Sequence, residues 1–143
     1  MTKHFFASVM TALCLSLTSP SFAQTEEQSL SKSLTKTVSV TGQMSTDKFK
    51  SLMQQGFKSV IVNRPDQEQG NLVTVDQLRN IAEQANVSVI YQPVVSGKIS
   101  QTDVAEFAKY YNELPKPILM VCRSGTRSKT LFDQAKAQGL LHE

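Results

Sequence analysis

The residue types most able to do chemistry in this sequence lie together at positions 122–128, which read Cys-Arg-Ser-Gly-Thr-Arg-Ser. This segment follows the apolar run 118–121 and precedes a helical pattern, so its backbone N–H groups and the helix N-terminus can converge on an anion. Gly125 permits the backbone angles that such a curl needs. Arg127 can bind two oxygens of a tetrahedral anion through its planar guanidinium. The same field favours the thiolate of Cys122, the nucleophilic form of a cysteine. We predict Cys122 as the nucleophile and Arg127 as a catalytic residue, with further substrate contacts from Arg123, Ser124, Gly125, Thr126 and Ser128.

Other kinds of catalytic site have little support in the sequence. Of the two histidines, only His142 lies beyond the N-terminal leader described below. A Ser-His-Asp triad, a Cys-His dyad and a Cys/His zinc site are therefore not expected, and we predict no metal and no organic cofactor. Cys122 has an alternative interpretation as a small buried core residue. The arginines, glycine and hydroxyl residues around it favour the anion site.

The first 23 residues have the pattern of a secretory signal peptide. Lys3 provides a positive start, an apolar stretch covers residues 5–17, and Ser-Phe-Ala at 21–23 fits a cleavage site before Gln24. The apolar stretch is too short to span a bilayer, which needs about 20 residues. We therefore predict a periplasmic or secreted protein, with an uncleaved membrane anchor as the alternative.

The rest of the chain has the size and composition of one soluble domain. Removing residues 1–23 from the 143 leaves 120, with 14 basic and 12 acidic residues. There is no basic stripe and no Trp, so we expect no nucleic-acid partner and, after cleavage, no membrane association; a small anionic substrate suits the mildly positive charge. Residues 24–36 are polar and are predicted to form a flexible tether, and residues 37–143 the folded domain. We make no prediction of oligomeric state.

Strand-like and helical patterns alternate along this domain. The strands are expected around Val38 and Val40 and at 59–62, 87–91 and 118–121, and the helices after Ser45, Thr74, Ser100 and Gly125. This alternation predicts an α/β fold with a mainly parallel central sheet flanked by helices. Ligands of such sheets bind beyond the carboxyl ends of the strands, where the loops 63–70, 93–100 and 122–128 begin.

Four blocks of sequence carry a resemblance to a known family. They read Thr-Gly-Gln at 41–43, Gly-Phe-Lys-Ser-Val-Ile at 56–61, Asn-Arg-Pro-Asp at 63–66 and Val-Cys-Arg-Ser-Gly-Thr-Arg-Ser at 121–128. With these blocks the chain resembles the beta-lactamase-hydrolase-like phosphatase family, bacterial relatives of the dual-specificity tyrosine phosphatases. The resemblance implies a cysteine-phosphatase-like fold, a nucleophilic cysteine and a phosphate-binding loop. Members of the family are also often labelled sulfurtransferases.

The loop departs from the tyrosine phosphatase pattern in its length. Tyrosine phosphatases have five residues between the nucleophilic cysteine and the arginine, whereas four separate Cys122 from Arg127. The shorter spacing matches the Cys-Arg-x-Gly-x-Arg pattern of rhodaneses, which transfer a sulfane sulfur through a cysteine persulfide. Loop length and overall resemblance therefore point to different reactions.

A phosphatase also needs a general acid for the leaving oxygen. Dual-specificity phosphatases use an aspartate in the loop that corresponds to residues 93–98, and this loop holds no carboxylate. Asp66 is the candidate replacement because its loop leaves the same sheet edge, although aspartates after proline are also common in turns. Arg64 is predicted to bind the anion, with pairing to Asp66 or Glu68 as the alternative.

Three functions follow from these residues. The first is a cysteine-dependent hydrolase of phosphate monoesters that forms a thiophosphate on Cys122. The second is a rhodanese-like sulfurtransferase with a Cys122 persulfide, which needs no general acid. The third is a non-catalytic redox or anion sensor, because a solitary thiolate is readily oxidised.

Overall fold

The computed structural model describes residues 29–143, so the predicted leader (1–23) and the first part of the predicted tether (24–28) lie outside the described residues. The strands are β1 (Lys32–Ser33), β2 (Val38–Thr41), β3 (Ser59–Val62), β4 (Ser88–Tyr91) and β5 (Ile118–Val121). The helices are α1 (Thr46–Met53), α2 (Val75–Gln84), α3 (Gln101–Glu113) and α4 (Thr126–Ala137). The strands form one sheet in the order β1-β2-β5-β3-β4.

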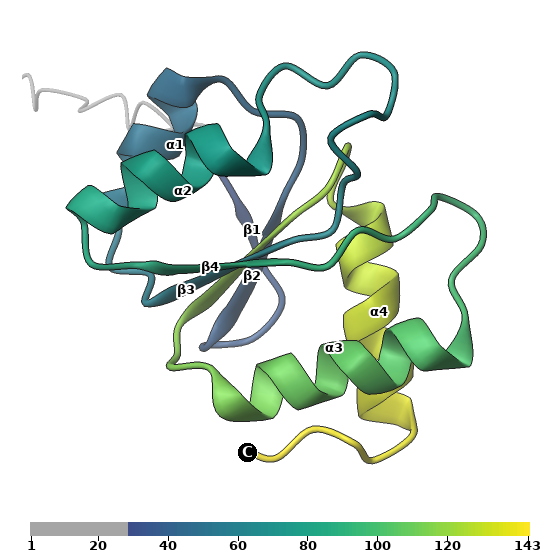
Figure 1. Ribbon diagram of the computed structural model, residues 1–143. Coiled ribbons are helices and arrows are strands. Elements are labelled where there is room, and N and C mark those ends of the chain that lie inside the picture. Colours follow the sequence, from purple (N-terminus) through teal and green to yellow (C-terminus); the bar gives the residue numbers. More distant parts are fainter. Residues whose placement is uncertain (1–28) are drawn as a thin grey trace, which may run out of the picture.

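All strand pairs except the first are parallel, which confirms the predicted fold class. β2 pairs with β5, β5 with β3 and β3 with β4 in parallel, whereas β1 runs antiparallel to β2. Helices α1 and α2 cover one face of the sheet, and α3 and α4 cover the other (Figure 1). The domain therefore has three layers, and the central strands β3 and β5 are buried on both faces.

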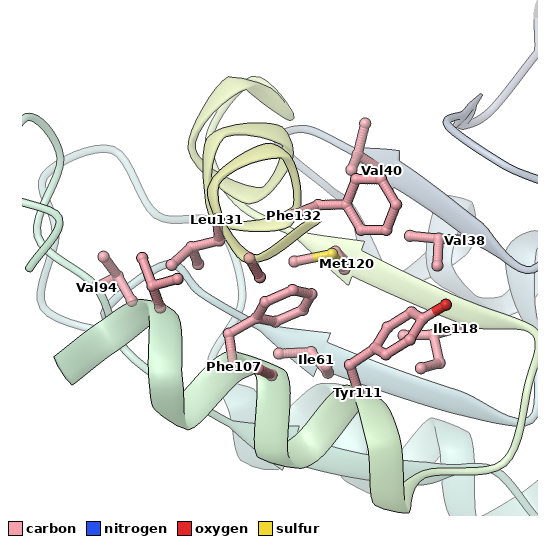
Figure 2. Packing of buried hydrophobic residues seen from close by; sticks show 13 residues of the cluster. Val38, Val40, Ile61, Val94, Phe107, Tyr111, Ile118, Met120, Leu131 and Phe132 are labelled. Atoms are coloured by element: carbon pink, nitrogen blue, oxygen red, sulfur yellow. The ribbon is translucent and has the colours of Figure 1, made fainter. Parts of the chain in front are cut away.

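The side chains of the central strands alternate between the two helical layers. Along β3, Val60 and Val62 belong to the cluster under α1 and α2, whereas Ile61 belongs to the cluster under α3 and α4. Figure 2 shows the second cluster, in which Phe107 of α3 and Phe132 of α4 pack over the sheet. This packing holds β2, β3 and β5 in register and brings the loops after them to one edge.

Three helices have polar N-cap residues at the positions that the sequence predicts. The hydroxyl of Ser45 accepts an N–H from the first turn of α1, and Thr74 and Ser100 form capping boxes with α2 and α3. The fourth helix differs, because its N-cap is Gly125 in the left-handed region (φ 88°) and no side chain caps it. The first-turn N–H groups of α4 are thus left for water or a bound anion.

The predicted boundary between tether and domain needs correction for residues 29–36. Lys32 and Ser33 pair with Val40 and Ser39 at the edge of the sheet, and Leu30 packs against the core. The Thr41 hydroxyl donates a hydrogen bond to the Leu30 carbonyl at 2.9 Å. Two paired residues are too few to produce an alternating sequence pattern, so this strand depends on the neighbouring edge of β2 rather than on its own composition.

Candidate active site

Cys122 lies at the base of the loop between β5 and α4. It is 1% exposed, and its backbone N–H donates to the Thr41 carbonyl at the end of β2 at 3.1 Å. The N–H of Gly125 donates to Cys122 Sγ at 3.0 Å. This hydrogen bond, which the curl of the loop makes possible, fixes the sulfur beneath the loop.

Arg127 projects from the first turn of α4 and is 7% exposed. Its Nη1 donates to the Val94 carbonyl at 2.9 Å, and its Nη2 lies 2.9 Å from the Glu68 carboxylate. Its Nε is buried and has no hydrogen-bond partner among residues 29–143. The guanidinium is therefore held in place at two nitrogens, and Arg127 and Cys122 both line one cleft.

Glu68 joins the two buried arginines. Its carboxylate contacts Nε of Arg64 at 3.2 Å as well as Arg127. The hydrogen bond from Arg127, followed by the charges of both arginines, holds the pKa of Glu68 below its usual value despite partial burial. The folded form thus gains from ionised Glu68 at pH values above the ordinary glutamate range, and loses this contribution as the pH falls through the lowered pKa.

Arg64 is buried and does not line the cleft at Cys122 and Arg127, although it borders a small cavity with Cys122. Its Nη2 donates to the Gln69 carbonyl at 3.0 Å, and its side chain pairs with Glu68, which was the alternative to anion binding. In this structure Arg64 supports Glu68, and through it Arg127. A direct contact between Arg64 and substrate stays a prediction.

Asp66 lies near Cys122 but has a structural partner. The two residues line one small cavity, and Asp66 Oδ1 accepts the Val75 N–H at the start of α2 at 2.9 Å. The N–H of Asp66 donates to the Tyr91 hydroxyl at 2.9 Å. The carboxylate thus caps a helix while standing close to the nucleophile, and its role as general acid stays a prediction.

Ser128 is fully buried and does not reach the cleft. Its hydroxyl donates to Asn63 Oδ1 at 2.8 Å, and Asn63 Nδ2 donates to the Gln92 carbonyl at 3.2 Å. Asn63 thereby connects the ends of β3 and β4 to α4. Neither its role nor the contact of Glu68 with Arg127 was predicted; the only signal for Asn63 is that a polar residue immediately follows an apolar strand.

The cleft above Cys122 has a volume of about 380 Å³. Its walls are the loop at 96–99 and the segment 122–127, and α4 contributes Thr130 and Gln134. Arg123, Ser124 and Thr126 are exposed at its rim, and the Ser124 hydroxyl donates to that of Thr126 at 3.2 Å. The predicted substrate-binding residues of the loop therefore surround the nucleophile, except for Ser128.

Gly42 allows the loop after β2 to approach the loop that carries Cys122. A Cβ at this position would lie 2.8 Å from the Arg123 carbonyl oxygen, which also accepts the Gln43 N–H at 2.7 Å. We expect Gly42→Ala to force these segments apart and to lower the free energy of unfolding by about 1–3 kcal/mol. Denaturant unfolding measures this, with Lys50→Ala on the exposed face of α1 as the control, expected within about 0.5 kcal/mol of wild type. Equal stability of all three proteins would show that the loop relaxes freely.

Within residues 29–143, no group of three or more His, Cys, Asp or Glu side chains is arranged to hold a metal ion. None of the four helices in this part of the chain is both long and apolar enough to cross a membrane.

The layers, the strand order and a cysteine between the central strand and a helix define the class of cysteine-phosphatase folds. Residues 31–139 match the family model described as "Beta-lactamase hydrolase-like protein, phosphatase-like domain". This chain belongs to that family, as the sequence resemblance predicted. The phosphatase-like domain and its neighbours support a phosphatase-like function.

Curated relatives share the domain but are much longer. The beta-lactamase hydrolase-like protein of Xylella fastidiosa (strain Temecula1) is 30% identical over 95 residues, which cover 66% of this chain and 22% of that protein. The corresponding protein of Agrobacterium fabrum is 33% identical over the same length, with the same coverage. The aligned part is thus about a fifth of these relatives, so the similarity concerns one domain of them.

Solved structures show the same fold. A Neisseria meningitidis protein named "putative phosphatase" has a TM-score of 0.69 and 30% identity, covering 74% of this chain and 75% of that one. A Shewanella putrefaciens protein of the same designation has a TM-score of 0.66 at 20% identity, covering 80% and 75%. The protein Tk-PTP in its active form has a TM-score of 0.54 at 16% identity, covering 76% and 81%, which shows likeness of fold alone.

Proposed function

We propose that this domain hydrolyses phosphate monoesters with Cys122 as the nucleophile. The observation that carries the proposal is that Cys122, whose Sγ accepts the Gly125 N–H, lines one cleft with Arg127, a buried arginine whose Nε has no partner among residues 29–143. These donors and the uncapped N-terminus of α4 suit the charge of a phosphoryl group as it is transferred.

The reaction has two steps. Cys122 sulfur attacks phosphorus, the ester P–O bond breaks, and the leaving oxygen takes a proton, which gives a thiophosphate on the enzyme. Water then attacks the same phosphorus and the P–S bond breaks, which releases inorganic phosphate and regenerates the thiolate. Arg127 and the loop amides hold the phosphoryl oxygens in both steps.

Asp66 is the proposed proton donor to the leaving oxygen. Asp66→Asn keeps an oxygen that can accept the Val75 N–H but cannot deliver a proton, so the variant should fold. We expect kcat for an alkyl phosphate to fall about 10²-fold and kcat for an aryl phosphate with a good leaving group to fall much less. Steady-state kinetics on both substrates checks this. Equal, small losses on both would assign Asp66 to capping α2 alone.

Sulfur transfer is the second candidate, and the four-residue spacing between Cys122 and Arg127 favours it. The residues of the 93–100 loop that line the cleft, such as Ser96 and Gly97, include no carboxylate, and sulfur transfer needs none. In this reaction Cys122 attacks the outer sulfur of thiosulfate, the S–S bond breaks and sulfite leaves. An acceptor such as cyanide then removes the sulfane sulfur. The relatives and structures reported above have the designations putative phosphatase, PTP or beta-lactamase hydrolase-like protein, which supports phosphate transfer as the first candidate.

Intact mass and phosphate release together decide between the two reactions. Wild type and Cys122→Ser are incubated separately with thiosulfate and with an aryl phosphate. Phosphate release by wild type only, without a gain of one sulfur in thiosulfate, is the expected result. A gain of one sulfur that depends on Cys122 and is removed by cyanide, without phosphate release, would replace the proposal with sulfur transfer.

The third candidate function, a redox or anion sensor, has less support. Cys122 is 1% exposed, which hinders oxidation by large oxidants and disfavours a sensor.

We also propose cleavage before Gln24 and a periplasmic or secreted mature protein. Recovery of a full-length chain from the cytoplasm, and none beginning at Gln24 outside it, would refute this location.

A further inference from the structure

A second cleft, of about 630 Å³, borders the same loop on a different side from the Cys122 cleft. It lies beyond β2, against residues 29–33 and the turn at Thr41 and Gly42. Ser124 and Thr126 line both clefts, so one loop separates them. Apart from Ser124, Thr126 and Gly125, whose N–H contacts Cys122 Sγ, the proposed catalytic function uses none of the residues around this second cleft.

Three lysines, and no aspartate or glutamate, are among the described residues that line it: Lys32 of β1, Lys48 of α1 and Lys129 of α4. Lys129 pairs with Asp133 one turn further along α4. Lys32 and Lys48 form no ion pair within residues 29–143. The cleft therefore carries an excess of positive charge from three separate elements. We call it the lysine cleft.

Lys48 is the least solvated of the three. Its side chain is half-buried, and this burial lowers the pKa of Lys48 from its usual value. A partly desolvated ammonium without a counter-ion costs free energy, which a bound anion would offset. Oxyanions with several charges suit three ammonium groups that approach from different sides.

We propose that the lysine cleft binds a second phosphate group of the substrate, so that the domain prefers compounds with two or more phosphates to monophosphates. This inference rests on the proposed function at Cys122. One phosphate occupies the Cys122 cleft, and the molecule crosses the rim formed by Ser124 and Thr126 so that its other phosphate meets Lys32, Lys48 and Lys129. The substrate class is thus a small bisphosphate or polyphosphate ester.

Competitive inhibition of aryl phosphate hydrolysis measures this preference, with inorganic phosphate and tripolyphosphate as the two probes. We expect tripolyphosphate to inhibit wild type at a concentration at least about tenfold lower than phosphate, since each charged hydrogen bond contributes about a factor of ten. Lys48→Met, which keeps an unbranched side chain, should weaken inhibition by tripolyphosphate about tenfold. Inhibition by phosphate and KM for the aryl phosphate should change less than about twofold.

Lys50→Met is the matched control, because Lys50 lies on the same helix, is exposed and does not line the cleft. It removes the same charge and should leave inhibition by tripolyphosphate unchanged. The helix start is preserved in Lys48→Met, since only the backbone N–H of Lys48 bonds to Ser45. Equal effects of Lys48→Met and Lys50→Met, or no effect of either, would overturn the inference.

Direct binding separates this inference from the catalytic proposal. Titration calorimetry of the full chain with tripolyphosphate needs no turnover. If aryl phosphate is not hydrolysed but tripolyphosphate binds more weakly to Lys48→Met than to wild type and Lys50→Met, the anion site stands and the hydrolase proposal fails. If hydrolysis occurs and tripolyphosphate binds all three proteins equally, the hydrolase stands and the lysine cleft is not a subsite.

Discussion

Cys122→Ser is expected to reduce aryl phosphate hydrolysis by about 10⁴-fold or more, because a serine hydroxyl lacking a neighbouring base is a very weak nucleophile at neutral pH. The substituted oxygen can still accept the Gly125 N–H, so the loop should keep its shape. Phosphate release under saturating substrate measures the loss, and thermal unfolding checks that the fold is intact. The variant should also keep its affinity for inorganic phosphate within a few-fold, since the other donors of the loop remain.

Substantial turnover in Cys122→Ser would contradict the covalent mechanism. If Cys122→Ser retained more than a tenth of wild-type turnover while folded, the sulfur would take no part in a covalent step. The reaction would then proceed by direct attack of water on the bound ester, with the loop acting only as an anion site. If a low residual rate remained in both Cys122→Ser and Cys122→Ala, that rate would come from binding of the ester in the loop and not from a nucleophile at position 122.

Arg127→Lys is expected to lower kcat/KM for the aryl phosphate about 10²- to 10³-fold while keeping the charge. A lysine ammonium is a point charge and cannot donate to the Val94 carbonyl, to Glu68 and to a bound phosphoryl oxygen with the geometry of a guanidinium. Loss of this geometry should affect kcat more than substrate binding, because charge on the phosphoryl oxygens is spread most widely in the transition state.

The matched control is Arg79→Lys, at a half-buried position where the arginine pairs with Asp76 on the surface of α2. It should leave kcat/KM unchanged. Glu68→Gln tests the support of Arg127, since the neutral amide removes the ion pair while keeping the side-chain shape. Wild-type turnover in Arg127→Lys would show that positive charge, rather than a positioned fork of donors, is what the reaction needs.

Local sequence signals determined most of the secondary structure and the nucleophile loop. The β-branched and apolar runs at 59–62 and 118–121 form strands because they are buried on both faces, and such runs are visible without knowledge of their neighbours. Ser45, Thr74 and Ser100 act within one turn of their own helices, so the helix starts could be read directly. The position of Cys122 between an apolar strand and a helix likewise depends on adjacent residues alone.

Tertiary structure alone decided which distant groups meet in the site. Glu68 and Arg127 are 59 residues apart, and Asn63 and Ser128 are 65 apart, so these contacts follow from the strand order and not from any local pattern. Arg64 was predicted to bind substrate; in the structure its buried guanidinium pairs with the half-buried carboxylate of Glu68, because a buried charge requires a partner, and a direct contact with substrate stays a prediction. The lysine cleft arises in the same way. Its three ammonium groups come from one strand and two helices, and each looks like an ordinary surface lysine until the fold places them around one cleft.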